Sequence, residues 1–240
     1  MPKKNTALFI VLGLAGVLVL TGVLVPAANG SKPGDLLYTI DRSAESAQIA
    51  FSGLSGAQAQ AETYLNLADE RIAELEALIG KVNTASLIQV VYAEDNDSEA
   101  DLSEDEQKDV DDLADDYSDN IEKANELAQE AKDNGVDTDE LLIKVAESTL
   151  KHQEVLLAVY DRVPEQAKDA IMNAMEKSQN GHDKATAAIS GQLREQIQQE
   201  QEERKQELDL KIEERKNKAQ ENRENGLDNK NTGGKPDSSN

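Results

Sequence analysis

Apolar positions divide this chain into one continuous apolar segment followed by a series of helical stripes. Residues 7–28 contain no charged side chain. These 22 residues exceed the roughly 20 that an α-helix needs to cross a bilayer hydrocarbon core. The segment therefore predicts an N-terminal transmembrane or signal helix.

Two fates of this N-terminal helix stay open, an uncleaved signal anchor and a removed signal peptide. A cleavable signal has an apolar region of about 7 to 15 residues, shorter than this one. The segments 25–27 and 28–30 resemble cleavage sites only weakly. Lys3 and Lys4 hold the short N-terminal side in the cytoplasm by the positive-inside rule. We therefore expect a single-pass cell-membrane protein with its C-terminal part outside, or alternatively a secreted one.

Downstream, apolar residues recur at steps of three and four, the period of an amphipathic helix. Gly53 and Gly56 bracket a turn, and Ser103 with Glu106 forms a capping box that starts a later helix. Asn134 and Gly135 end that helix, after which Asp137 or Thr138 caps the next. The pattern predicts five helices, at about 36–52, 57–80, 103–133, 138–163 and 164–193.

The last two of these helices should fold back on each other as an antiparallel hairpin, because Val163 and Pro164 separate their stripes. Beyond Leu193 apolar residues thin out, and i,i+4 pairs of acid and base support an exposed charged helix. From Asn225 the composition predicts a disordered tail. The predicted fold class is all-α, an elongated antiparallel bundle with a long charged C-terminal helix. The predicted regions are 1–30 (signal anchor or signal peptide), 31–134 (acidic helical domain), 135–193 (helical hairpin), 194–224 (charged arm) and 225–240 (tail).

Charge and composition narrow the function classes. The chain has 48 acidic and 25 basic residues and a formal charge of −23, which excludes binding of nucleic acid through phosphate neutralisation. Aromatic residues make up 3% and tryptophan is absent, so we expect thin helical layers and no aromatic platform for a sugar. Cysteine is also absent, which excludes disulfides, thiol catalysis and a lipoprotein anchor.

A short motif after the apolar segment resembles a known family. Residues 33–42 read Pro-Gly-Asp-Leu-Leu-Tyr-Thr-Ile-Asp-Arg, and residues 67–72 read Leu-Ala-Asp-Glu-Arg-Ile. Both resemble extracytoplasmic helical domains catalogued as domain of unknown function 5667, over residues 32–132. Relatives often have Lys-Arg after the tyrosine, where this chain has Asp41-Arg42. The resemblance implies an exported helical domain and supplies no catalytic residues.

The most acidic stretch, residues 94–119, has fourteen acidic residues and one basic residue. Its carboxylates alternate at its start and imitate the ligand spacing of an EF-hand calcium loop. Ala100 stands at the position where an EF-hand loop needs glycine. Two alternatives to a specific calcium site therefore stay open: diffuse, weak binding of Ca²⁺ and a solvated acidic loop. The candidate metal ligands are Asp95, Asp97, Glu99, Asp101 and Glu106.

The two histidines, His152 and His182, lie on the apolar stripes of the predicted hairpin, offset by about 10 Å along it. This offset argues against one shared metal. Histidines that hydrogen-bond a neighbouring helix are expected instead, and a pH-sensing role stays open because imidazole titrates near neutrality.

These observations favour a non-enzymatic, membrane-anchored extracytoplasmic protein that binds another protein or the cell envelope. The expected mechanism is helix-in-groove or coiled-coil pairing through the stripes of 138–163 and 164–193, with a homo-oligomer as one outcome. No cofactor is expected beyond weakly bound Ca²⁺. The alternative function is a divalent-cation-binding or envelope-stress module that uses residues 94–119.

Overall fold

The computed structural model describes residues 38–80 and 102–232, and within them the chain is helical with no strand. This confirms the predicted all-α class. None of the described helices is both long and apolar enough to span a membrane, and the predicted span at 7–28 lies outside the described residues. The helices are α3 (Tyr38–Ser55), α4 (Ala57–Gly80), α6 (Glu104–Asp133), α7 (Asp139–Tyr160), α8 (Lys168–Ala188) and α9 (Gly191–Thr232), with a 3₁₀ turn at Glu165–Ala167.

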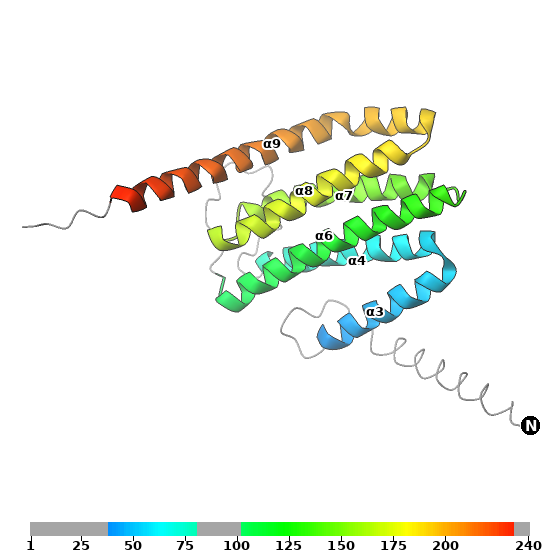
Figure 1. The fold of residues 1–240 in the computed structure, drawn as a ribbon, viewed down its shortest axis with the longest axis horizontal. Coiled ribbons are helices and arrows are strands. Elements are labelled where there is room, and N and C mark those ends of the chain that lie inside the picture. Colours follow the sequence, from blue (N-terminus) through cyan, green and yellow to red (C-terminus); the bar gives the residue numbers. More distant parts are fainter. Residues whose placement is uncertain (1–37, 81–101, 233–240) are drawn as a thin grey trace, which may run out of the picture.

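Four of these helices, α4, α6, α7 and α8, form a bundle around one hydrophobic core (Figure 1). Helix α4 packs on α6, α6 on α8, α8 on α7 and α7 on α4, so each helix has two close neighbours. The core is continuous across the predicted boundary at residue 134. The remaining two helices lie on opposite sides of the bundle, α3 against α4 and α9 against α7 and α8.

Local sequence signals explain where most helices start and stop. Ser103 and Glu106 form the predicted capping box of α6. At the other end Gly135 has a positive φ of 82°, while the Val136 N–H donates to the Ala131 carbonyl (3.0 Å), as in a Schellman motif. The Asp139 N–H donates to Asp137 Oδ1 (3.2 Å) before α7. Gly56, with φ of 108°, provides the tight turn between α3 and α4.

The apolar stripes of α7 and α8 face into the bundle. Val145, Leu156, Ile171 and Met175 are all buried. The hairpin of α7 and α8 is present as predicted, but its stripes are used inside the molecule. The prediction that they pair with a partner is therefore wrong for the folded chain, because α4 and α6 already cover them.

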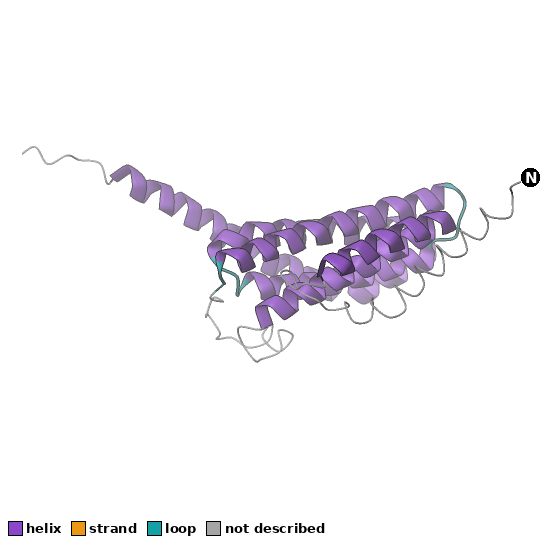
Figure 2. Cartoon of the chain, turned by 90° about the horizontal axis from the view of Figure 1, so that it is seen from below, coloured by secondary structure: helices purple, strands orange, loops and turns teal. Residues whose placement is uncertain are grey.

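The charged C-terminal segment differs from the predicted exposed arm. Helix α8 ends at Ala188, the chain reverses at Ile189 and Ser190, and α9 returns along the bundle (Figures 1 and 2). Ile197, Leu208 and Ile212 of α9 are buried against it. Helix α9 also continues to Thr232, past the predicted start of the tail at Asn225, because a formed helix extends at little cost per residue.

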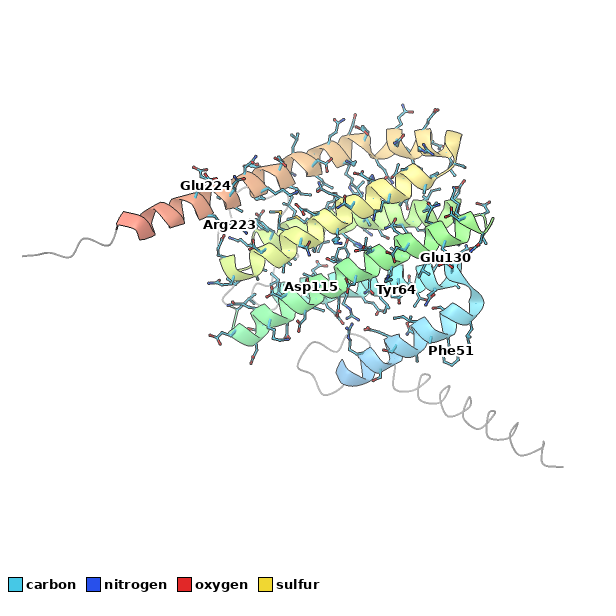
Figure 3. The ribbon with its side chains drawn as sticks, in the orientation of Figure 1. Phe51, Tyr64, Asp115, Glu130, Arg223 and Glu224 are labelled. Carbon is cyan, nitrogen blue, oxygen red and sulfur yellow. The ribbon has the colours of Figure 1, made fainter. Side chains whose placement is uncertain are left out.

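Helix α3 is held more loosely than the core helices. Of its side chains from Arg42 onward, Glu45 alone is buried. Phe51 lies near the C-terminal end of the helix (Figure 3). Phe51 is 49% exposed and Leu54 is 84% exposed. The attachment of α3 therefore depends on charged groups, which are described below.

Candidate functional site

Helix α6 presents an acidic surface on the side opposite its core stripe. Val110, Leu113 and Tyr117 point into the core, and the carboxylates between them point outward because of the 3.6-residue helical period. Figure 3 shows Asp115 on this helix. We define the acidic face of α6 as Glu104, Asp105, Asp109, Asp112, Asp115, Asp116 and Asp119, all exposed or half-buried.

Few basic groups neutralise this acidic face. Lys108 pairs with Asp112 on the same helix, and Arg42 of α3 pairs with Asp116 (2.8 Å). Burial, and then the neighbouring Asp112, raises the pKa of Asp109. Burial, followed by Asp115 and Asp112, likewise raises the pKa of Asp111, which lies beside the face. Burial therefore disfavours the charged forms of these two carboxylates, and like-charged neighbours on α6 add to the effect.

Of the five predicted calcium ligands, the described structure includes Glu106 alone. Asp95, Asp97, Glu99 and Asp101 lie outside the described residues. Glu106 serves the helix cap, where its carboxylate accepts from the Ser103 N–H (3.0 Å) and the Ser103 hydroxyl (2.8 Å). Within residues 38–80 and 102–232, no three His, Asp or Glu side chains converge on a point that could hold a metal ion.

A buried ion-pair network joins α3 to α4. Arg71 of α4 is fully buried and pairs with Glu45 of α3 and Glu74 of α4. Arg42 extends the network by pairing with Glu45 (2.9 Å) and with Asp116 on α6. Three helices therefore meet through charges in a region where apolar contacts of α3 are few.

The histidines lie in polar contacts between core helices, as expected. His182 Nδ1 lies 2.9 Å from the Ala146 carbonyl on α7. His152 Nε2 lies 2.8 Å from Asp69 Oδ1 on α4, and its ring packs edge-on against Tyr117 with centroids 5.4 Å apart. His152 Nδ1 is buried without a hydrogen-bond partner.

Tyr117 continues this polar contact into the core. Its hydroxyl donates to Ser178 Oγ (2.8 Å), and the Ser178 hydroxyl donates to the Thr149 carbonyl (2.8 Å). Burial raises the pKa of Tyr117 well above its usual range, so the phenol stays protonated. Ser178 is fully buried and engaged at both ends, which makes it a structural hydroxyl and not an accessible nucleophile.

The network around Arg71 is not among the features expected from the sequence, although one local signal for it is present. Arg71 stands on the apolar stripe of α4, one turn from Leu75 and next to Ile72. A charge at such a position requires a buried partner. The partner Glu45 is 26 residues away on another helix, and no spacing rule identifies it.

Comparison with known proteins supports the resemblance noted from the motifs. Residues 30–101 match the family model of a domain of unknown function (DUF5667). The described part of this match is α3 and α4, including Asp69 and Arg71. No curated protein and no solved structure matches the chain.

Proposed function

We propose that this protein is a non-catalytic, membrane-tethered helical module that binds a basic partner outside the cytoplasm. The tether is the apolar segment 7–28, and the binding surface is the acidic face of α6. A basic, helical protein segment is the partner class that best complements this surface.

One observation carries the proposal: the acidic face of α6 is displayed outward by a helix whose opposite side is locked in the core. Surface potentials of this kind raise the rate of association with an oppositely charged partner and select for its charge. In the interior, by contrast, the Tyr117 and Ser178 hydroxyls are engaged in contacts between helices. Binding at the surface is therefore better supported than chemistry in the interior.

The test is binding of a lysine-rich helical peptide to the full chain in detergent micelles, measured by fluorescence anisotropy. In the test variant, Asp105, Asp109, Asp112 and Asp115 become Asn. We expect affinity to fall at least tenfold, because neutralisation removes four charges from one helical face.

The matched control changes the net charge equally but elsewhere. In it, Glu195, Glu203, Glu213 and Glu221 of α9, all exposed, become Gln. The control should bind as the wild type does. Equal loss in both variants would mean that the peptide responds to net charge alone, which contradicts a site on α6.

The tether is tested separately. Cells that express a C-terminally tagged chain are treated with protease from outside and then fractionated. The mass of the intact chain is measured by mass spectrometry. A full-length, membrane-bound and protease-sensitive product supports the proposal, whereas a released product that starts near residue 28 or 31 makes the protein a secreted one. A cytoplasmic, protease-protected product contradicts export.

A divalent-cation-binding or envelope-stress module is the second candidate, favoured by the raised pKa values of Asp109 and Asp111. A cation that neutralises residues 94–119 would reduce the repulsion that Asp112 and Asp115 add to the effect of burial on these two carboxylates. Circular dichroism with sub-millimolar calcium should then show a gain of helix, which Asn at Asp95, Asp97 and Asp101 should abolish. An unchanged spectrum would contradict this candidate.

A further inference from the structure

The contact between α9 and the bundle, which we term the seam, combines the buried aliphatic residues of α9 with ion pairs of one polarity. Arg204 forms two bonds to the Glu154 carboxylate (2.5 and 2.6 Å), and Arg215 two to Asp161 (2.7 and 2.9 Å). In each ion pair of the described seam the base is on α9. The acid is on α7 or α8 or, for Asp161, at the residue that directly follows α7. The further pairs are Lys216 with Glu176, Lys205 with Asp183 and Arg223 with Asp169.

The bases of α9 repeat with the same spacing as its buried apolar residues. Arg204 and Arg215 are eleven residues apart, as are Lys205 and Lys216, and Ile197 and Leu208. Eleven residues make three helical turns of about 3.67 residues each. Residues eleven positions apart therefore lie on the same face of a nearly straight helix. Helix α9 thus has a continuous face that is basic and aliphatic.

The seam is weaker than the contacts inside the bundle. Helix α9 approaches α7 and α8 less closely than these two approach each other. A polar cavity of about 280 Å³ lies between α8 and α9. Two atoms of residues that line it, Thr186 Oγ1 and Gln201 Oε1, are buried without a hydrogen-bond partner. Exposed ion pairs contribute only about 0.2–1 kcal/mol each and are screened by salt.

We infer that α9 is a displaceable strap, and that the α7–α8 face beneath it is a docking surface for a basic amphipathic helix of a partner protein. Charge complementarity identifies the occupant, because the acids of α7 and α8 fit bases spaced as they are on α9. The strap pivots at Ser190, whose N–H and hydroxyl donate to the Asp139 carboxylate. This surface is distinct from the acidic face of α6.

The first experiment measures whether charge holds the strap in place. The chain has no cysteine, so spin labels can be attached at K151C on α7 and E213C on α9, both exposed positions. The full chain in detergent should give one narrow distance by pulsed electron paramagnetic resonance. R204E/R215E/R223E should broaden and lengthen that distance, and adding E154R/D161R/D169R should restore it.

A control variant, K123E/K211E/K218E, carries the same change of net charge outside the seam and should keep the narrow distance. If R204E/R215E/R223E also keeps it, or if the control loses it equally, complementary charge does not hold α9 and the inference is overturned.

The second experiment tests the docking surface. A fluorescent peptide of residues 191–224 is added in trans to the full chain. It should bind R204E/R215E/R223E at least tenfold more tightly than the wild type, whose own α9 blocks the face, and binding should be lost with E154R/D161R/D169R.

Equal binding to wild type and variant, or no binding to either, overturns the docking surface. Light scattering on the wild type distinguishes a further outcome. A stable dimer whose labels report α9 seated on the other copy would assign the face to self-association and overturn the partner-helix inference.

Discussion

Arg71 shows how one side chain holds α3 in place. Its guanidinium is completely buried and contacts the two buried carboxylates of Glu45 and Glu74. Removing Arg71 takes away the buried base that both carboxylates share, whereas replacing the whole cluster by apolar residues is often neutral.

We therefore expect Arg71→Met to lower the free energy of unfolding by about 3–5 kcal/mol. Arg71→Met combined with Glu45→Leu and Glu74→Leu should recover most of that loss, because no buried charge is left alone. Urea unfolding followed by circular dichroism measures both variants. A triple variant as unstable as the single one would show that the network does more than balance its own charges.

Asp111 provides a prediction about pH. Its pKa is raised mainly by burial and then by Asp115 and Asp112, so its charged form is disfavoured in the folded state. The contribution of Asp111 to stability should therefore become more favourable as pH falls through this raised pKa. Asp111→Asn removes the penalty and should add about 0.5 kcal/mol at pH 7, comparable to relief of one like-charge i,i+4 pair.

The gain from Asp111→Asn should vanish below about pH 3.8, the ordinary pKa of the carboxyl, because the wild-type residue is then neutral in both the folded and unfolded states. Thermal unfolding between pH 3 and pH 7 measures this dependence. A gain that is independent of pH would exclude charge as its cause.

Among the helices, α8 depends on one small residue for its closest approach to α6. A Cβ atom placed on Gly181 would lie 2.6 Å from Ile121 Cγ2, 3.2 Å from Asn125 Nδ2 and 3.3 Å from Thr149 Cγ2. These atoms come from α6 and α7, so α8 meets both neighbours at this glycine.

Gly181→Ala should destabilise the protein by about 1–3 kcal/mol through overpacking, although alanine favours the helix by about 1 kcal/mol. Gly191→Ala at the start of α9 is the control, since nothing lies within 4 Å of its added Cβ, and it should be neutral or stabilising. Chemical denaturation of both variants separates packing from helix propensity. A stabilising Gly181→Ala would contradict the close approach.

At the scale of the whole molecule, net charge and local charge pairing respond to salt in opposite ways. The formal charge of −23 destabilises the compact state by self-repulsion, whereas the seam pairs attract. Salt screens both.

Raising NaCl from about 20 mM to 500 mM, a change that shortens the Debye length severalfold, should raise the thermal midpoint of the bundle. Relief of about 1 kcal/mol corresponds to roughly 2–4 °C in a chain of this size. Amide hydrogen exchange in α9 should become faster over the same range, while that in α6 slows. Parallel slowing in both helices would contradict the electrostatic seam.

Sequence alone determined the helical class, most helix boundaries and the α7–α8 hairpin, because these depend on local signals. The Ser103 and Glu106 cap, the Gly135 stop and the 3.6-residue stripes each act within a few residues of chain. The matched family segment was likewise identified from short motifs.

Tertiary structure decided which helical faces are buried in the core and which are exposed. From the sequence, the apolar stripes of α7 and α8 are equally compatible with a core and with a binding surface. The packing of α4 and α6 against them places them in the core. Arg204, which has Glu200 four residues before it, also pairs with Glu154 fifty residues away. Which acid a base of α9 pairs with depends on how the chain reverses at Ser190 and on which distant charges then come within reach. Local periodicity contains no information about either.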